Sequence, residues 1–347
     1  MTRRLRIDFC HPIAHLGLHK GLVMKRIIAI CLLMALAGWT GPTGARPLTR
    51  KDVNAAEFTV PHRNNDRALL IKVQVLLDRA GFSPGVIDGR PSSNLANALA
   101  AFQQQNGMPV SGELEEVTWS KLAESSAEPA LTVYAISKDD VGGPFTEEIP
   151  DSYPKKAALK QLAYTGPAEL LAERFHLDED LLADLNPGKT FDQAGTVIVV
   201  ANVNHSPPKA EVTKVIVEKS RRSVRALDQD GKLVGFYPAS IGSDEKPAPT
   251  GILKITRIVR DPIYIYNPRF RFPGVEAQKT LKIAAGPNNP VGSVWMNLNQ
   301  PTYGIHGTAE PAKIGKAYSH GCVRLTNWDA GALAAMVKKG TIVEFVE

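Results

Sequence analysis

The residues best suited to covalent chemistry lie in two short segments near the carboxyl end of the chain. They read YGIHGT at 303–308 and SHGCVRLTN at 319–327. Cys322 is a nucleophile only as a thiolate, and a free thiol with a pKa of about 8.5 is only a few per cent ionised near neutral pH. His306 and His320 both lie within 16 residues of Cys322, so each is a candidate acceptor of the thiol proton. The pattern predicts a cysteine nucleophile activated by histidine.

Two other interpretations stay open on composition alone. Cys10 and Cys31 lie in the expected leader, so Cys322 has no disulfide partner, and a lone cysteine is often a buried, inert side chain. Cysteine and histidine also bind zinc. One cysteine and two histidines leave no well-spaced further ligand, and we therefore expect no metal.

The neighbours of Cys322 suit acyl transfer. Gly321 leaves the backbone unhindered beside the thiol, which favours an oxyanion hole built from amide N–H groups. Arg324 is able to hold a substrate carboxylate through two parallel hydrogen bonds.

The two segments together resemble the L,D-transpeptidase catalytic domain, whose signature is a histidine, a gap, then Ser-His-Gly-Cys-x-Arg and a following asparagine. The resemblance covers about Lys214 to Glu347. It implies that Cys322 is the nucleophile and His306 the general base, with the carbonyl of Gly307 orienting the imidazole. It further implies a secondary role for His320, an oxyanion hole at Gly321 and Cys322, and substrate-binding roles for Trp295, Tyr303, Ser319, Arg324 and Asn327.

The same resemblance implies a reaction and its partners. The thiolate attacks a tetrapeptide stem of peptidoglycan, D-alanine leaves, and an amine of a second stem takes the acyl group in a 3→3 cross-link. Alternatives are attachment of an outer-membrane lipoprotein, hydrolysis of such links, L,D-carboxypeptidase activity, or wall binding without catalysis. No cofactor is implied, and carbapenems are expected to acylate the cysteine.

Strands in which every second residue is apolar are predicted to position these residues. From 212 to 347 apolar residues recur with period two, as at Val215 and Val217, and Asp230-Gly231 is typical of a hairpin turn. Further strands are expected at 252–259, 263–266, 294–298 and 342–346, with one helix at 328–338. The domain is therefore predicted to be mainly β.

Residues 67–125 show helical periodicity in three short segments. They resemble the peptidoglycan-binding domain family through Val73-Gln74, Asp88-Gly89, Phe102-Gln103 and Thr118-Trp119. The family usually has Gly and Thr before the second helix, where this chain has Ser92 and Asn94. The alternative is a helical spacer.

Residues 161–203 predict two helices, beginning at Pro167 and after Asp178, and a strand at 196–201. This unit resembles a LysM module, a glycan binder, although its usual opening is absent; a spacer is the alternative. Segments 46–66 and 126–160 are expected to be linkers. The whole is a multidomain α+β protein.

The amino-terminal 45 residues predict a leader. From Met24, a candidate translation start, two cations precede an apolar run of about a dozen residues, the layout of a secretory signal peptide; an uncleaved anchor is the alternative. This segment holds six of the 41 Lys and Arg residues and one of the 35 acids, so the remainder is almost neutral. The charge therefore argues against nucleic acid, and we expect export to the periplasm or cell envelope.

Overall fold

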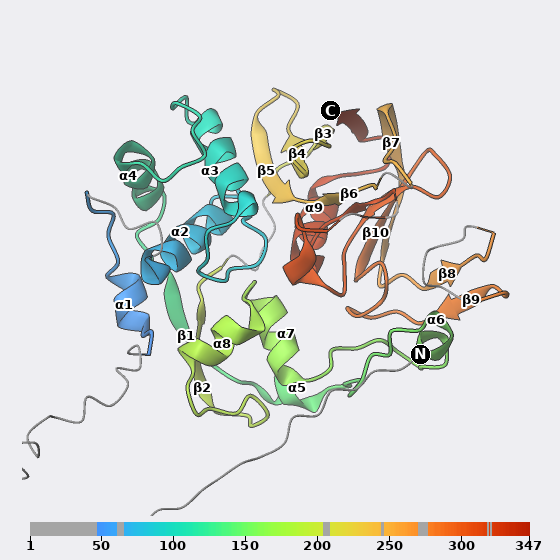
Figure 1. Cartoon of the computed structure of the whole chain (residues 1–347), viewed down its shortest axis with the longest axis horizontal. Helices are drawn as coiled ribbons and strands as arrows, with labels where there is room; N and C mark the ends of the chain where they lie inside the picture. Colours follow the sequence, from blue (N-terminus) through green and yellow to red (C-terminus); the bar gives the residue numbers. More distant parts are fainter. Residues whose placement is uncertain are drawn as a thin grey trace, which may run out of the picture. The chain divides into compact units, whose positions relative to one another are not determined.

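Helices predominate in the amino-terminal half and strands in the carboxyl-terminal half of the computed structural model (Figure 1), which confirms the predicted mixture of helices and sheets. The structure describes residues 47–60, 66–203, 209–243, 246–269, 277–317, 319 and 321–347; the expected leader lies outside them. Residues 47–347 form one compact unit. None of the described helices is long and apolar enough to cross a bilayer.

The strand-rich region at 212–347 is built on a nine-stranded sheet with the order β5-β4-β3-β13-β7-β10-β11-β12-β6. Most neighbours are antiparallel, whereas β13 with β3 and β11 with β12 are parallel. Helix α9 (Asn327–Met336) packs on β10 and β11. The strands are β3 (Lys214–Glu218), β4 (Ser223–Leu227), β5 (Leu233–Pro238), β6 (Ser240–Ile241), β7 (Gly251–Arg260), β10 (Val294–Leu298), β11 (Gly304–His306), β12 (Val323–Arg324) and β13 (Ile342–Val346).

Three helices of the predicted 67–125 region share one core. Asp66 and Ser92 cap the first two by accepting hydrogen bonds from backbone N–H groups. The core also takes in Leu233 and Phe236 of β5, so this region is packed onto the sheet. The helices are α2 (Arg67–Arg79), α3 (Ser93–Gln105) and α4 (Glu116–Glu124).

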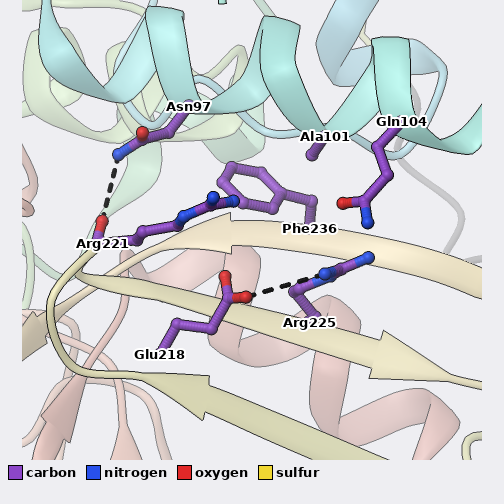
Figure 2. Close-up of a pocket in the computed structure, with 7 residues that line it drawn as sticks. All are labelled: Asn97, Ala101, Gln104, Glu218, Arg221, Arg225 and Phe236. Carbon is purple, nitrogen blue, oxygen red and sulfur yellow. Dashed lines mark hydrogen bonds and ion pairs between the residues drawn. The ribbon is translucent and has the colours of Figure 1, made fainter. Parts of the chain in front are cut away.

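A small hollow lies where α3 crosses β3, β4 and β5 (Figure 2). Asn97 donates from Nδ2 to the carbonyl of Arg221 (3.0 Å), and Arg225 pairs with Glu218 (3.6 Å). None of the predicted site residues lines the hollow, and β4 lies toward the opposite end of the strand order from β12. It is a packing interface between the helices and the sheet.

The unit at 161–203 gains a strand that the sequence did not predict, from residues 131–135. Helices α7 (Pro167–Arg174) and α8 (Glu179–Leu185) and strand β2 (Val197–Ala201) form as expected. Strand β1 (Leu131–Ala135) pairs antiparallel with β2 over its whole length. The prediction of a linker at 126–160 is therefore wrong, since β1 finds its partner more than 60 residues away, beyond the reach of local periodicity.

The rest of that segment is also structured. Helix α5 (Lys138–Gly142) begins with a capping box, and α6 (Tyr153–Ala157) packs against β9 (Leu281–Ile283). The Tyr153 ring makes edge-to-face contacts with Tyr264 and Tyr266 of β8 (Tyr264–Tyr266), which pairs with β9. This arm therefore connects the helix pair to the β8–β9 hairpin.

The predicted linker at 46–66 likewise contains a helix, α1 (Arg50–Asn54), within its described part. Thr49 and Asp52 form a capping box, and the fully buried Val53 joins the core of α7, α8 and β2. A single apolar residue on one turn gives no periodicity from which to predict it.

Candidate active site

The pairing of three strands gathers the predicted chemical residues on one face of the sheet. His306 lies opposite Trp295 across the β10–β11 pair and opposite Arg324 across the parallel β11–β12 pair. Paired side chains point to the same face, and successive ones alternate. Ile305 and Val323, both fully buried, therefore face the core. Cys322 lies in the bend directly before β12, the strand that pairs with β11.

His306 is held as a neutral ring with a defined tautomer. It is 3% exposed, and its Nδ1 lies 2.7 Å from the carbonyl oxygen of Gly307. A carbonyl only accepts, so Nδ1 carries the proton and Nε2 is left as the acceptor. Burial, followed by the positive charge of Arg324, lowers the pKa of His306 to about 3, although the bond to Gly307 opposes the shift. The ring is therefore a neutral proton acceptor.

The indole of Trp295 fixes the plane of this imidazole. The two rings stack with centroids 5.1 Å apart and planes 22° from parallel. Gly304 makes the stack fit, because a Cβ at that position would lie 2.6 Å from Trp295 Cζ2. Trp295 thus has a packing contact with His306, and this contact alone explains its place.

Cys322 is partly exposed beside the backbone of the β10–β11 turn. Its Sγ donates to the carbonyl of Thr302 (3.5 Å). Thr302 has φ +73°, a costly conformation for a β-branched residue and one found at functional sites. Burial raises the pKa of the thiol, while a hydrogen bond from Gly304 and the charge of Lys246 oppose that shift. The resting pair is thus a thiol and a neutral imidazole.

Gly321 and Tyr303 shape the loop before the cysteine. Gly321 has φ +95°, a conformation that L side chains rarely adopt, and a Cβ there would lie 3.0 Å from Tyr303 Cε1. The Tyr303 hydroxyl donates to the carbonyl of Pro247 (3.4 Å), and the ammonium of Lys246 lies 5.4 Å from the Tyr303 ring centroid. Lys246, which sequence reasoning missed, gave no motif signal.

Two residues predicted to bind substrate are occupied by protein contacts. Ser319 is 1% exposed; its hydroxyl donates to the carbonyl of Cys322 and its N–H to that of Gly242. The Asn327 amide is buried and bonded at both ends. These contacts indicate that both side chains support the backbone of the site and do not contact substrate. Arg324, by contrast, is partly exposed on the face of His306.

Asn327 is the centre of a polar cluster behind His306. Its Oδ1 accepts from the N–H groups of Ser293 (3.1 Å) and Thr308 (3.2 Å). Its Nδ2 donates to the carboxyl of Glu173 on α7 and to the carbonyl of Pro287. Glu173 is a second residue that sequence reasoning missed, since one glutamate on an amphipathic helix normally faces water.

The secondary histidine, His320, lies outside the described residues. Within the described ranges, no group of three or more His, Cys, Asp or Glu side chains is arranged to hold a metal ion.

Comparison with known proteins adds sequence relationships to this geometry. Residues 213–345 match the model of the L,D-transpeptidase catalytic domain (YkuD), and residues 66–122 match that of a peptidoglycan binding domain. The chain is 31% identical over 177 residues to the L,D-transpeptidase YkuD of Bacillus licheniformis, covering 50% of this chain and 90% of that protein. It is 28% identical over 188 residues to the L,D-transpeptidase YbiS of Escherichia coli K12, covering 53% and 61%. The solved L,D-transpeptidase 3 of Mycobacterium tuberculosis overlaps 44% of this chain and 76% of its own at 17% identity, with a TM-score of 0.33.

Proposed function

Since the chain belongs to the L,D-transpeptidase family, we propose that it transfers the acyl group of a peptidoglycan tetrapeptide stem through a thioester on Cys322. The observation that carries this proposal is the tautomer of His306. Its Nδ1–H is bound to Gly307, so Nε2 is the nitrogen available to take a proton, and Cys322 directly precedes the strand paired with that of His306.

In the first half-reaction His306 Nε2 takes the thiol proton, and Sγ attacks the carbonyl of the third-position diamino acid. The tetrahedral intermediate collapses with cleavage of the peptide bond, and D-alanine leaves with the proton from His306. Because the resting thiol is protonated and the imidazole neutral, proton transfer accompanies attack and does not precede it.

In the second half-reaction an amine attacks the thioester. His306 takes the amine proton and returns it to the sulfur as the new amide forms, which regenerates the thiol. A side-chain amine of another stem gives a 3→3 cross-link. A lysine of an outer-membrane lipoprotein gives an anchored protein, and water gives a carboxypeptidase product.

The backbone around Cys322 supplies the remaining requirements. The N–H groups of Gly321 and Cys322 stabilise the oxyanion, since the positive φ of Gly321 permits a turn that side chains disfavour. Arg324 contributes positive charge beside both reacting groups, and it binds a carboxylate of the stem peptide. Tyr303 packs against Gly321, in the loop before Cys322.

The upstream regions bring this chemistry to the wall. The leader at 1–45 directs export to the periplasm, and the 66–122 domain binds peptidoglycan. The strand β1, helices α7 and α8, and strand β2 form a LysM-like glycan module whose opening strand is β1. Carbapenems acylate Cys322, because their strained amide places an electrophilic carbonyl where the stem carbonyl binds.

Mass spectrometry of muropeptide products tests the proposal. Residues 46–347 are incubated with purified tetrapeptide muropeptides, with Cys322→Ala as the control. We expect a dimer lighter than two monomers by one alanine, absent from the control. Tripeptide monomer alone would indicate carboxypeptidase activity or a missing lipoprotein acceptor. Full turnover by Cys322→Ala would contradict the assignment.

The assignment of the base is tested in the same assay. His306→Ala should lose nearly all turnover, and His320→Ala should lose less. Equal losses would mean that the base is not His306 alone.

A further inference from the structure

The polar cluster behind His306 joins two regions of the fold that are far apart in sequence. Asn327 begins α9 in the strand-rich domain, whereas Glu173 lies on α7, 154 residues earlier. Asn327 Nδ2 lies 3.2 Å from Glu173 Oε1 and 3.1 Å from Oε2. Both residues are buried, at 6% and 7% exposure. A buried carboxyl is costly, so such a contact requires compensating hydrogen bonds.

The orientation of the Asn327 amide follows from its partners. Two backbone N–H groups, of Ser293 and Thr308, meet one end of it, and N–H groups bond only to an oxygen. The other end is therefore the NH2 group, which needs acceptors. Glu173 and the carbonyl of Pro287 supply them. Removing Glu173 leaves a buried donor with one acceptor fewer.

This amide lies directly against the backbone that orients the base. A Cβ on Gly307 would lie 2.3 Å from Asn327 Oδ1, and one on Gly292 would lie 2.1 Å from it. The carbonyl of Gly307 accepts the Nδ1–H of His306, and the next residue, Thr308, donates to Asn327. A displacement of the Asn327 amide therefore moves the peptide that holds the imidazole.

Tyr164 completes the support of the carboxyl, donating from its hydroxyl to Glu173 Oε2 (3.3 Å). Burial raises the pKa of Glu173 to about 8, against the hydrogen bonds from Asn327 and Tyr164 that lower it. Near neutral pH the group is thus mostly a neutral carboxylic acid. Glutamine has the same shape and charge as that form.

We propose that Glu173, which lies outside the catalytic domain, is a positioning residue for transfer: through Asn327 it holds the Gly307–Thr308 backbone and so the ring of His306. The inference rests on the proposed function, since it concerns the base of that reaction. It makes the helix-pair region part of the active-site scaffold, whatever glycan it binds.

Steady-state kinetics of the full chain with Glu173→Leu and Glu173→Gln test this role. The leucine variant should lower kcat by about 10- to 100-fold, the usual cost of a lost supporting hydrogen bond or of a small displacement of a catalytic group. KM should stay near the wild-type value, because Glu173 is far from substrate contact in this mechanism. The glutamine variant should restore kcat, since its carbonyl accepts from Asn327.

Glu169 offers a matched control on the same helix. Its Oε1 accepts from Asn288 Nδ2 (2.8 Å), so it also ties α7 to the strand-rich domain, yet it has no hydrogen bond to Asn327. Glu169→Leu should leave kcat almost unchanged. An equal loss in both leucine variants would show that general docking matters and would overturn the proposal.

A double-mutant cycle tests whether Glu173 acts through Asn327. If Glu173 acts through Asn327, Glu173→Leu combined with Asn327→Ala should be no slower than Asn327→Ala alone. Additive losses would overturn the route. Circular dichroism checks folding. If the leucine variant is unfolded, Glu173→Asp, which withdraws the carboxyl by one methylene, must lower kcat, and an unchanged kcat would contradict the proposal.

The alkylation of Cys322 by iodoacetamide needs no wall substrate. It therefore distinguishes failure of the positioning role from failure of the proposed function. If the wild type forms no muropeptide product, the proposed function fails. In that case slower alkylation in Glu173→Leu, with wild-type rates in Glu173→Gln and Glu169→Leu, still supports the positioning role. Equal alkylation rates in all variants would contradict it.

Discussion

Two histidines in this chain each stack on a tryptophan ring, and their surroundings shift their pKa values in opposite directions. His306 stacks on Trp295 at 5.1 Å, and His176 stacks on Trp328 at 5.0 Å. Each uses Nδ1 for a short hydrogen bond, to the Gly307 carbonyl in the first case and to an Asp78 carboxylate (2.9 Å) in the second. The rings differ mainly in whether that partner is charged.

The charges around each ring decide what it can do. Burial and Arg324 lower the pKa of His306 to about 3. Burial also lowers the pKa of His176, but the charge of Asp78, its hydrogen bond and the charge of Asp329 outweigh burial and raise the pKa overall. A neutral ring accepts a proton, whereas an imidazolium anchors anions. His306 is suited to catalysis and His176 to joining α2, α7 and α9.

Alanine at each position should separate the two roles most sharply in turnover. His306→Ala should lower kcat by about 10²- to 10⁴-fold, the usual contribution of a general base. His176→Ala should keep turnover per folded molecule close to wild type. Muropeptide product formation, normalised to folded protein, measures both. A comparable loss in His176→Ala would contradict the division.

The order should reverse for the free energy of unfolding. His176→Ala leaves the Asp78 carboxyl near Asp329 without its hydrogen-bonded partner, and breaking such a pair from one side costs about 3 kcal/mol. The loss in His306→Ala should be smaller, because that variant breaks no ion pair. Urea unfolding of the two variants at pH 7 gives the comparison. An equal or smaller loss in His176→Ala would contradict a stabilising role for the His176–Asp78 pair.

Lowering the pH should reduce the free energy of unfolding of the wild type through protonation of His306. Its pKa is about 3 in the folded chain and near 6.5 when unfolded, so the unfolded chain binds the proton first as pH falls. The stability that depends on a neutral His306 is therefore lost as the pH falls from 6.5 to 3. From pH 6 to 4.5 the wild type should lose about 2 kcal/mol more than His306→Ala. Parallel unfolding curves for the two proteins over this range would contradict the depressed pKa.

The tryptophans should give the smallest effects. The indole N–H of Trp328 is buried and has no hydrogen-bond partner within the described part of the chain. Trp328→Phe removes that unsatisfied donor and keeps an aromatic face, so stability should change by less than about 1 kcal/mol. Trp295→Phe likewise keeps a ring against His306. Thermal melts and kcat measure the pair, and a large loss of kcat in Trp328→Phe would refute the assigned roles.

The sequence predicted those parts of the molecule that depend on local pattern. Alternation placed the strands around Val215 and Met296, and residue type with spacing singled out Cys322 and His306. The neutral state of His306 was not predictable, since it depends on burial and on Arg324 from the next strand.

Long-range partners explain the rest. Strand β1 needs β2 before it is a strand, and the two-residue strands β6 and β12 are too short to show any alternation. Glu173 is buried only because α7 packs near α9, which no pattern on α7 itself predicts. The sequence therefore identified the candidate residues Cys322 and His306 and missed Glu173 and Lys246, whose contacts depend on distant segments.

The parallel pairing of β11 with β12 bears on how this fold tolerates change in length. His306 lies on β11 and Cys322 directly precedes β12, its parallel neighbour, and the described part of the connecting segment after Thr308 lies outside that ladder. Their separation in space is set by strand register and not by the number of residues between them. We therefore expect that a change in the length of this connection leaves the pairing of β11 with β12 in place.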